Sequence, residues 1–185
     1  VISDIDDTVK VSHVTDRARL MDATFFQDFS AVPGMAPLYA EWARQGATIH
    51  FVSSSPWHLY APLNELLRQA GFPTATLALK QIRLKDSTIL DLFKDASKTK
   101  PPAIEALLAA YPGRRFVLVG DSGELDPEIY AGTLRKHPDR IAQILIRNVT
   151  NAKPDDARFA AAFADIGSDL WQLFDEPAQI RWRPQ

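Results

Sequence analysis

The sequence contains no cysteine among its 185 residues, which excludes a disulfide framework and suits a reducing compartment. It also lacks any run of about 18 or more apolar residues, the length that a membrane-spanning helix requires, and no signal peptide is visible. The formal net charge is only −2, so no bulk field favours nucleic acid or an anionic membrane. We therefore expect a cytoplasmic protein without a nucleic-acid partner, in which peripheral contact with a membrane remains an option.

The remaining composition is typical of a globular domain. Hydrophobic residues make up 46% of the chain, and 185 residues are enough for one domain with a full core. No internal repeat, low-complexity tract or linker divides the chain, so residues 1–185 are expected to form one domain. The chain begins at Val1 without methionine, and its first apolar segment is cut short before Asp4. We expect that the domain is truncated there and that further residues lie upstream.

The first polar cluster of the chain is rich in carboxylates. Asp4 and Asp6 are two residues apart, so in an extended segment their side chains lean to the same side and repel each other in a partly buried site. A cation between them, or a proton on one of them, would relieve this repulsion. Oxygen donors without cysteine or histidine favour Mg²⁺ over zinc. The alternative is an aspartate-rich turn that only ends a strand or caps a helix.

Two later apolar segments also end in polar residues. Residues 47–52 predict a buried parallel strand that ends at Ser53, and residues 115–119 predict another strand that runs into Asp121. Further strands are expected at residues 76–84 and 141–149, and helices at residues 35–45, 59–70, 104–111 and 159–166, with another that begins near residue 127.

This alternation of strands and helices predicts an α/β fold, in which a parallel sheet is covered by helices on both faces. Such sheets bind ligands outside the carboxyl ends of their strands. Asp4, Ser53 and Asp121 all fall at these ends, so we expect them to share one site.

The segment Asp4-Ile5-Asp6-Asp7-Thr8 resembles the DxDxT motif of the haloacid dehalogenase (HAD) phosphatase superfamily. The resemblance implies a HAD-type Rossmann-like fold, with Asp4 as the nucleophile that forms an aspartyl-phosphate and Asp6 as the general acid and base. Asp7 fits neither role. The segment between the second and third motifs holds only a helix, a strand and a connector, so no large cap domain is expected.

Two further catalytic roles follow from the same resemblance. A serine that ends the second strand would hydrogen-bond a phosphate oxygen; Ser53 fits best and Ser55 is the alternative. A lysine before the next helix would neutralise charge on the nucleophile and on the transferred phosphoryl group. Lys100 fits this place best, and Lys98 is the alternative.

The metal set implied by the resemblance draws on both acidic segments. Asp4 and Asp121 would ligate Mg²⁺ through their carboxylates, and Asp6 would contribute its main-chain carbonyl. Asp126 would orient the waters of the metal, or Lys100. Gly120, before Asp121, allows a tight turn and a close approach.

Three stretches narrow the resemblance to the phosphatidate phosphatase family typified by the fungal actin-patch enzyme. They are Ser3-Asp4-Ile5-Asp6-Asp7-Thr8, Phe51-Val52-Ser53-Ser54-Ser55-Pro56-Trp57 with Tyr60, and Gly120-Asp121-Ser122-Gly123-Glu124 with Asp126-Pro127-Glu128-Ile129-Tyr130. Ser54 departs from the pattern, because asparagine is expected there. The family implies Mg²⁺-dependent removal of phosphate from phosphatidate, which gives diacylglycerol. The carboxylate spacing by itself indicates phosphoryl transfer only.

Two other functions stay open. One is a HAD phosphatase that acts on a soluble phosphorylated metabolite or a phosphoprotein, and the other is a catalytically silent adaptor for lipid or protein. Three surface features bear on the choice. Residues 15–30 carry an apolar stripe that either packs in the core or touches lipid. His13 is either an ordinary surface histidine or reaches the site from a flap. Arg83 and Lys85 lie either on a solvated edge or facing a phosphorylated substrate.

Overall fold

The computed structural model describes residues 1–11, 30–80 and 96–181, and the side chains of residues 96 and 97 are also outside the description. The expectations for His13, for most of the apolar stripe at residues 15–30, and for Arg83 and Lys85 therefore lie outside the described residues.

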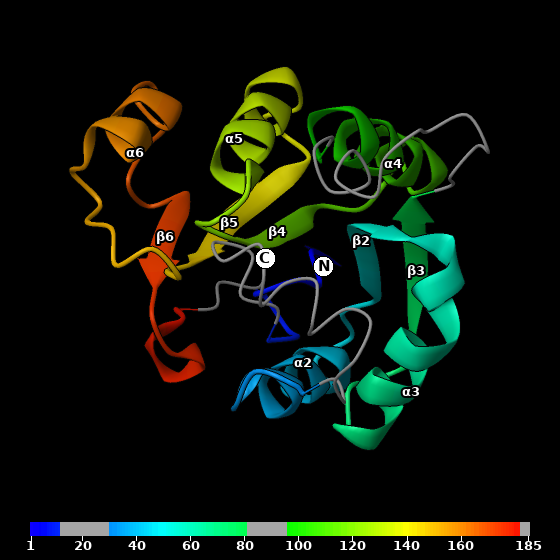
Figure 1. Ribbon diagram of the computed structural model, residues 1–185. Coiled ribbons are helices and arrows are strands. Elements are labelled where there is room, and N and C mark those ends of the chain that lie inside the picture. Colours follow the sequence, from blue (N-terminus) through cyan, green and yellow to red (C-terminus); the bar gives the residue numbers. More distant parts are fainter. Residues whose placement is uncertain (12–29, 81–95, 182–185) are drawn as a thin grey trace, which may run out of the picture.

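The centre of the protein is a six-stranded sheet in which every pair of neighbouring strands is parallel (Figure 1). The strand order is β3-β2-β1-β4-β5-β6, so the short first strand lies in the middle. The strands are β1 (Ile2–Ser3), β2 (Ile49–Pro56), β3 (Ala75–Lys80), β4 (Phe116–Asp121), β5 (Ile141–Arg147) and β6 (Trp171–Phe174). The predicted α/β fold with a parallel sheet is confirmed.

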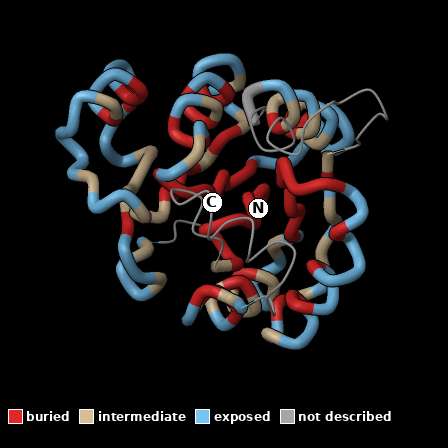
Figure 2. Tube along the Cα trace, in the orientation of Figure 1, coloured by how far each residue is buried: buried red, intermediate tan, exposed pale blue. Residues whose placement is uncertain are grey.

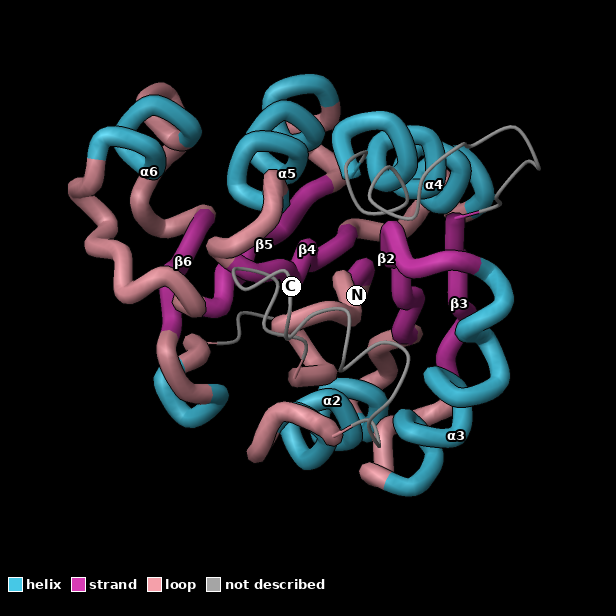
Figure 3. The backbone as a smooth tube through the Cα atoms, in the orientation of Figure 1, coloured by secondary structure: helices cyan, strands magenta, loops and turns pink. Residues whose placement is uncertain are grey.

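Helices cover both faces of the sheet. One face carries α2 (Met35–Arg44) and α3 (Tyr60–Gln69), and the other carries α4 (Ala96–Ala110), α5 (Asp126–Lys136) and α6 (Ala157–Ala162) (Figure 3). The described residues include no separate cap domain, as expected. Within them, no helix has the length and apolar character that crossing a bilayer requires.

Alternation along the strands divides the apolar residues between two cores. In β4, Val117 and Val119 join the cluster beneath α2 and α3, while Phe116 and Leu118 join the cluster beneath α4, α5 and α6. Both faces of the central strands are therefore buried, which accounts for their nearly continuous apolar sequence. Figure 2 shows this buried layer between more exposed helices.

Two elements extend beyond the ranges that the sequence predicts. The strand expected at residues 47–52 continues through the serines to Pro56, because β2 goes on pairing with β3, where Ser53 lies opposite Leu79. The helix expected at residues 104–111 begins at Ala96 and contains Pro101 and Pro102. Local preferences disfavour helix before proline, so contacts with the rest of the fold hold this first part of α4.

The strand β6 has no counterpart in the predicted elements. It is only four residues long, too short for its alternation to be distinctive. Its position depends on pairing with β5 and on Trp171, whose ring stacks on Phe163 with 4.2 Å between centroids.

The core beneath α2 gives a direct test of this packing. Trp42 is 1% exposed and its ring lies 4.9 Å from that of Tyr39, so Trp42→Ala should lower the free energy of unfolding by about 3–5 kcal/mol. Trp57 is 53% exposed, so Trp57→Ala is the matched control and should change stability by less than about 0.5 kcal/mol. Urea unfolding measures both. Equal losses in the two variants would contradict the placement of Trp42.

Candidate active site

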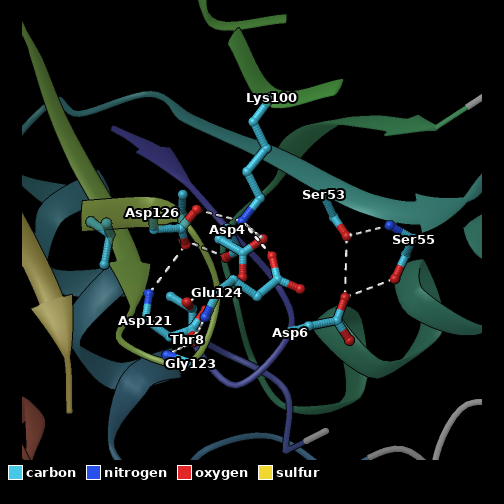
Figure 4. A network of polar contacts seen from close by, with 12 residues as sticks. Asp4, Asp6, Thr8, Ser53, Ser55, Lys100, Asp121, Gly123, Glu124 and Asp126 are labelled. Carbon is cyan, nitrogen blue, oxygen red and sulfur yellow. Dashed lines mark hydrogen bonds and ion pairs between the residues drawn. The ribbon is translucent and has the colours of Figure 1, made fainter. Parts of the chain in front are cut away.

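The predicted site residues meet at the carboxyl edge of the sheet. Asp4 follows β1 directly, and its N–H donates to the Val119 carbonyl at 2.8 Å. Asp121 is the last residue of β4, and Ser53 lies in the final part of β2. Since β2 and β4 are the two neighbours of β1, these side chains are brought together as expected (Figure 4).

Asp4, Asp121 and Asp126 form a buried carboxylate group. One oxygen from each lies within 4.8 Å of the others, an arrangement that could hold a metal ion. Asp121 ends β4 and Asp126 begins α5, so two of the three carboxylates flank the turn between these elements. Gly120 makes this possible, because a Cβ there would lie 2.3 Å from Asp126 Oδ2.

Hydrogen bonds account for some of these oxygens and leave others unused. Asp121 Oδ1 accepts from the Gly123 N–H at 2.6 Å and from the Glu124 N–H at 3.1 Å, whereas Asp121 Oδ2 is buried and has no hydrogen-bond partner within the described part of the chain. Asp4 Oδ2 accepts from the Thr8 hydroxyl at 3.2 Å. A buried carboxylate oxygen without a partner is costly, and a bound cation would satisfy it. The residues therefore fit a metal ion with oxygen ligands.

Lys100 lies fully buried among the carboxylates. Its Nζ is 2.9 Å from Asp4 Oδ1 and donates to Glu124 Oε2 at 2.9 Å and to Asp126 Oδ1 at 2.5 Å. Lys98, the alternative, is exposed and lies two residues earlier in α4, which turns it away from Lys100 around the helix. The structure thus brings Lys100 to the site and leaves Lys98 at the surface.

Burial and neighbouring charges shift the pKa values of Asp4, Asp121, Glu124 and Lys100. Burial raises the pKa of Asp4 and Asp121 well above the usual value, and the neighbouring carboxylates add to the effect, while Lys100 opposes it. The pKa of Glu124 is raised for the same reasons. Burial alone would lower the pKa of Lys100, but the surrounding carboxylates raise it well above its usual value. Lys100 is therefore a permanent cation here.

The Asp6 carboxylate faces a different set of partners. Asp6 Oδ2 accepts from the hydroxyls of Ser53 at 3.2 Å and Ser55 at 2.7 Å, and Asp6 Oδ1 accepts from Lys10 Nζ at 2.7 Å. Both serines proposed for the second motif thus reach the same oxygen (Figure 4). The Asp6 side chain is not part of the carboxylate group that could hold a metal, and a role for its main-chain carbonyl stays a prediction.

The turn after Asp6 is hydrogen-bonded to Arg147, the last residue of β5. Asp7 has a left-handed backbone with φ of 49°, a conformation that aspartate adopts more readily than most residues. Its carbonyl accepts from Arg147 Nη1 at 2.5 Å. Sequence analysis gave Asp7 no chemical role, and the structure uses it to turn the chain between Asp6 and Thr8.

Arg158 is a residue that sequence analysis missed. Its guanidinium donates to the carbonyls of Ser122 and Glu124 and forms a two-point ion pair with Glu128. Those contacts fix the loop whose N–H groups bind Asp121. In the sequence Arg158 belongs to an alanine-rich helix and resembles an ordinary surface arginine, so no local signal marks it.

Comparison with known proteins agrees with the sequence motifs. Residues 1–148 match the family described as the catalytic domain of phosphatidate phosphatase APP1. The chain belongs to this family. Phosphatidate phosphatase APP1 of Saccharomyces cerevisiae is 33% identical over 184 residues, which cover 97% of the chain and 31% of that protein. An uncharacterized Schizosaccharomyces pombe protein is 30% identical over 152 residues, or 80% of the chain and 25% of that protein.

The chain spans about a third or less of the curated relatives that it matches. The APP1 catalytic-domain match includes all the carboxylates of the site, Lys100 and both candidate serines. Arg158 and the strand β6 lie beyond the matched residues. The resemblance to a phosphatidate phosphatase family is therefore confirmed.

Gly120 should be required for the metal-binding geometry. Gly120→Ala places a methyl group 2.6 Å from the Asp126 Cβ, which sits on the rigid start of α5, so Asp126 must move. We expect a loss of about 1–3 kcal/mol in stability and about 10–100-fold in affinity for a divalent cation, measured by calorimetric titration. Gly132→Ala is the control, because Gly132 lies in α5 and a Cβ added there has no atom within 4 Å. An unchanged cation affinity in Gly120→Ala would contradict the assignment.

The raised carboxylate pKa values predict an unusual pH dependence for the metal-free protein. The fold raises the pKa of Asp4 and Asp121 above their usual 3.8, so above that pH the folded state binds more protons than the unfolded state. Stability in the presence of a chelator should therefore fall as the pH rises above 3.8. Thermal melting between pH 4 and pH 8, with and without chelator, measures this.

Asp121→Asn tests whether the buried carboxylate charge causes the loss of stability at higher pH. Asparagine Oδ1 can still accept from the Gly123 and Glu124 N–H groups, but the buried charge is gone. The variant should be more stable than the wild type by about 1–2 kcal/mol at neutral pH without metal, and it should lose the stabilisation by added cation. Asp165→Asn, which removes an exposed partner of Arg135, is the control and should not gain stability. A wild-type pH profile in Asp121→Asn would refute the explanation.

Proposed function

We propose that this domain, residues 1–185, is a Mg²⁺-dependent phosphatase that converts phosphatidate to diacylglycerol through an aspartyl-phosphate on Asp4. The proposal is carried by one observation: in a chain of the APP1 catalytic-domain family, two buried carboxylates and a buried lysine lie around the buried Asp4 at the carboxyl edge of a parallel sheet. Phosphoryl transfer needs this combination of an anionic nucleophile and concentrated positive charge.

Mg²⁺ is the metal that the donor set favours. Asp4, Asp121 and Asp126 offer carboxylate oxygens only, and the group contains neither histidine nor cysteine. Asp4 and Asp121 would hold the ion directly, while Asp126 would act through its hydrogen bond to Lys100 or through bound water. When bound, the metal would neutralise the phosphoryl oxygens during transfer.

Asp4 is the proposed nucleophile because it lies between Lys100 and the carboxylates that would share the metal. The Thr8 hydroxyl orients Asp4 Oδ2, and Lys100 lies 2.9 Å from Asp4 Oδ1. Lys100 would offset part of the effect of burial on Asp4, a bound cation would further favour the ionised carboxylate, and Lys100 would then neutralise charge on the transferred phosphoryl group. An ionised carboxylate can attack phosphorus and form the aspartyl-phosphate.

Asp6 is the proposed general acid and base. It would protonate the departing alkoxide and then remove a proton from the attacking water. Ser53 and Ser55 orient the carboxylate through their hydroxyls. For Ser53 to hydrogen-bond a phosphate oxygen, its proton must turn away from Asp6 when substrate binds. Ser53 Oγ would stay anchored by the Ser55 N–H, which donates to it at 2.9 Å.

The lipid substrate rests on family membership. The Saccharomyces cerevisiae relative is named a phosphatidate phosphatase and covers 97% of this chain. The site geometry by itself suits any phosphomonoester. The described part of the chain contains no cap domain over the carboxylates, which suits a substrate with a large body.

Replacement of the nucleophile should abolish turnover. Asp4→Asn removes the attacking charge while keeping the side-chain shape, so phosphate release should fall by at least about a thousandfold and the protein should stay folded by thermal melting. Asp7→Asn is the matched control, because asparagine tolerates the left-handed backbone of that position, and it should keep most of the activity. Substantial residual activity in Asp4→Asn would refute the nucleophile assignment.

The substrate is tested by comparing phosphate release from phosphatidate in mixed micelles with release from a soluble aryl phosphate, both with Mg²⁺ and with chelator. Faster Mg²⁺-dependent release from the lipid supports the proposal. Release from the aryl phosphate alone would keep the phosphatase chemistry and discard the lipid. No release from either substrate would favour a silent adaptor domain.

A further inference from the structure

Large apolar side chains are exposed mainly around the catalytic edge. Among the described residues, those that stand out are Trp57 at 53% exposed, Tyr60 at 39%, Tyr111 at 40% and Leu125 at 44%. Trp57, Tyr60 and Leu125 all follow the carboxyl ends of β2 or β4. Tyr111 follows α4 at the opposite edge, where its ring lies 5.2 Å from that of His50.

Trp57 and Tyr60 form a stacked pair. Their ring centroids are 5.1 Å apart with an interplanar angle of 28°, and they lie in η1 (Trp57–Leu59) and at the start of α3. Leu59, between them, is buried and anchors this turn to the core. Tryptophan and tyrosine combine an apolar ring with a polar tip, which is the chemistry of side chains that settle at a membrane–water interface.

Leu125 lies on the other side of Asp4. It sits between Glu124 and Asp126, directly before α5. Because β2 and β4 both pair with β1, their carboxyl ends are about 10 Å apart. The aromatic pair and Leu125 thus flank the carboxylates from two directions along one edge of the sheet.

Lysines lie at the same edge. Lys80 ends β3 and is paired in register with Pro56, beside the aromatic turn. Lys98 is exposed in the first turn of α4, close in sequence to Lys100. Cationic side chains next to interfacial aromatics are complementary to anionic phospholipid headgroups.

We propose that Trp57, Tyr60 and Leu125 form a membrane-contact surface, which enters the headgroup region of an anionic phospholipid bilayer and presents the carboxylate site to that bilayer. The inference rests on the proposed function for the substrate that lies in the membrane, and it adds which residues meet the lipid surface. These residues differ from the apolar stripe at residues 15–30 that the sequence suggested for lipid contact.

A bilayer fits this surface better than a protein partner does. A stable protein interface buries about 800 Å² on each side around a contiguous apolar centre. Here the exposed apolar groups stand apart on a polar edge, because Asp4 follows β1, between the aromatic turn after β2 and the acidic loop after β4 that holds Leu125. A bilayer surface can receive separate side chains while leaving the polar site open to headgroups.

The test uses the full-length chain, and it measures binding to vesicles of phosphatidylcholine with phosphatidylglycerol, an anionic lipid that is not a phosphomonoester. Trp57→Ala with Tyr60→Ala should weaken binding by about tenfold or more, because two interfacial aromatic side chains are removed. Tyr111→Ala is the matched control and should bind as the wild type does. Turnover of a soluble aryl phosphate should be unchanged in all variants, and thermal melting checks that they fold.

Wild-type vesicle binding by the double variant would overturn the proposal, as would an equal loss in Tyr111→Ala. Failure of the wild type to bind vesicles while it hydrolyses the aryl phosphate would overturn the surface and leave the phosphatase chemistry standing. Specific loss of binding in the double variant, without phosphate release from phosphatidate by the wild type, would support the surface while refuting the proposed function. Leu125→Ser provides a second variant, expected to weaken vesicle binding without the aromatic pair being touched.

Discussion

The ion cluster around Lys100 ties the structure together. One buried ammonium group contacts carboxylates that follow β1 and β4, and so it joins α4 to the two central strands. A buried charge without partners would cost several kcal/mol, and each member of this cluster is tolerated only because the others are present. The first turn of α4 precedes two prolines and is unfavourable by local preference. The contacts of Lys100, which lies directly before these prolines, explain why this turn is helical. The same charges shift the pKa values of the site, and the carboxylates would be stabilised by a bound cation. The Asp121 oxygen without a hydrogen-bond partner among the described residues also favours a cation there.

The geometry of the acidic loop depends on backbone details more than on side-chain identity. Gly120 leaves room for the Asp126 carboxylate, whose Oδ2 in turn accepts from the Asp121 N–H at 3.2 Å. Arg158 donates to carbonyls on the outer side of the loop, while N–H groups of the loop's own backbone donate inward to Asp121. The arginine comes from a part of the chain beyond the family match. The carboxyl-terminal segment therefore contributes to the site through positioning.

One edge of the sheet combines two kinds of surface. Most polar groups at the strand ends are buried and hydrogen-bonded to one another, whereas Asp121 Oδ2 and Ser54 Oγ have no hydrogen-bond partner among the described residues, and apolar side chains beside them stay exposed. The exposed side chains of Trp57, Tyr60 and Leu125 follow the carboxyl ends of β2 and β4, so they share an edge of the sheet with the buried carboxylates.

The sequence by itself determined the parallel α/β fold and indicated which residues the fold brings together at its carboxyl edge, because buried strands and motif spacing are local patterns. Asp4, Ser53, Lys100 and Asp121 are all recognisable from the segments that contain them. Only the tertiary structure brought Lys100 and not Lys98 to the carboxylates, placed both serines on Asp6, and extended α4 across its prolines. It also revealed the strand β6 and the role of Arg158. These features depend on contacts between residues far apart in the chain, where local propensity is neutral or opposed, so no pattern within one segment could specify them.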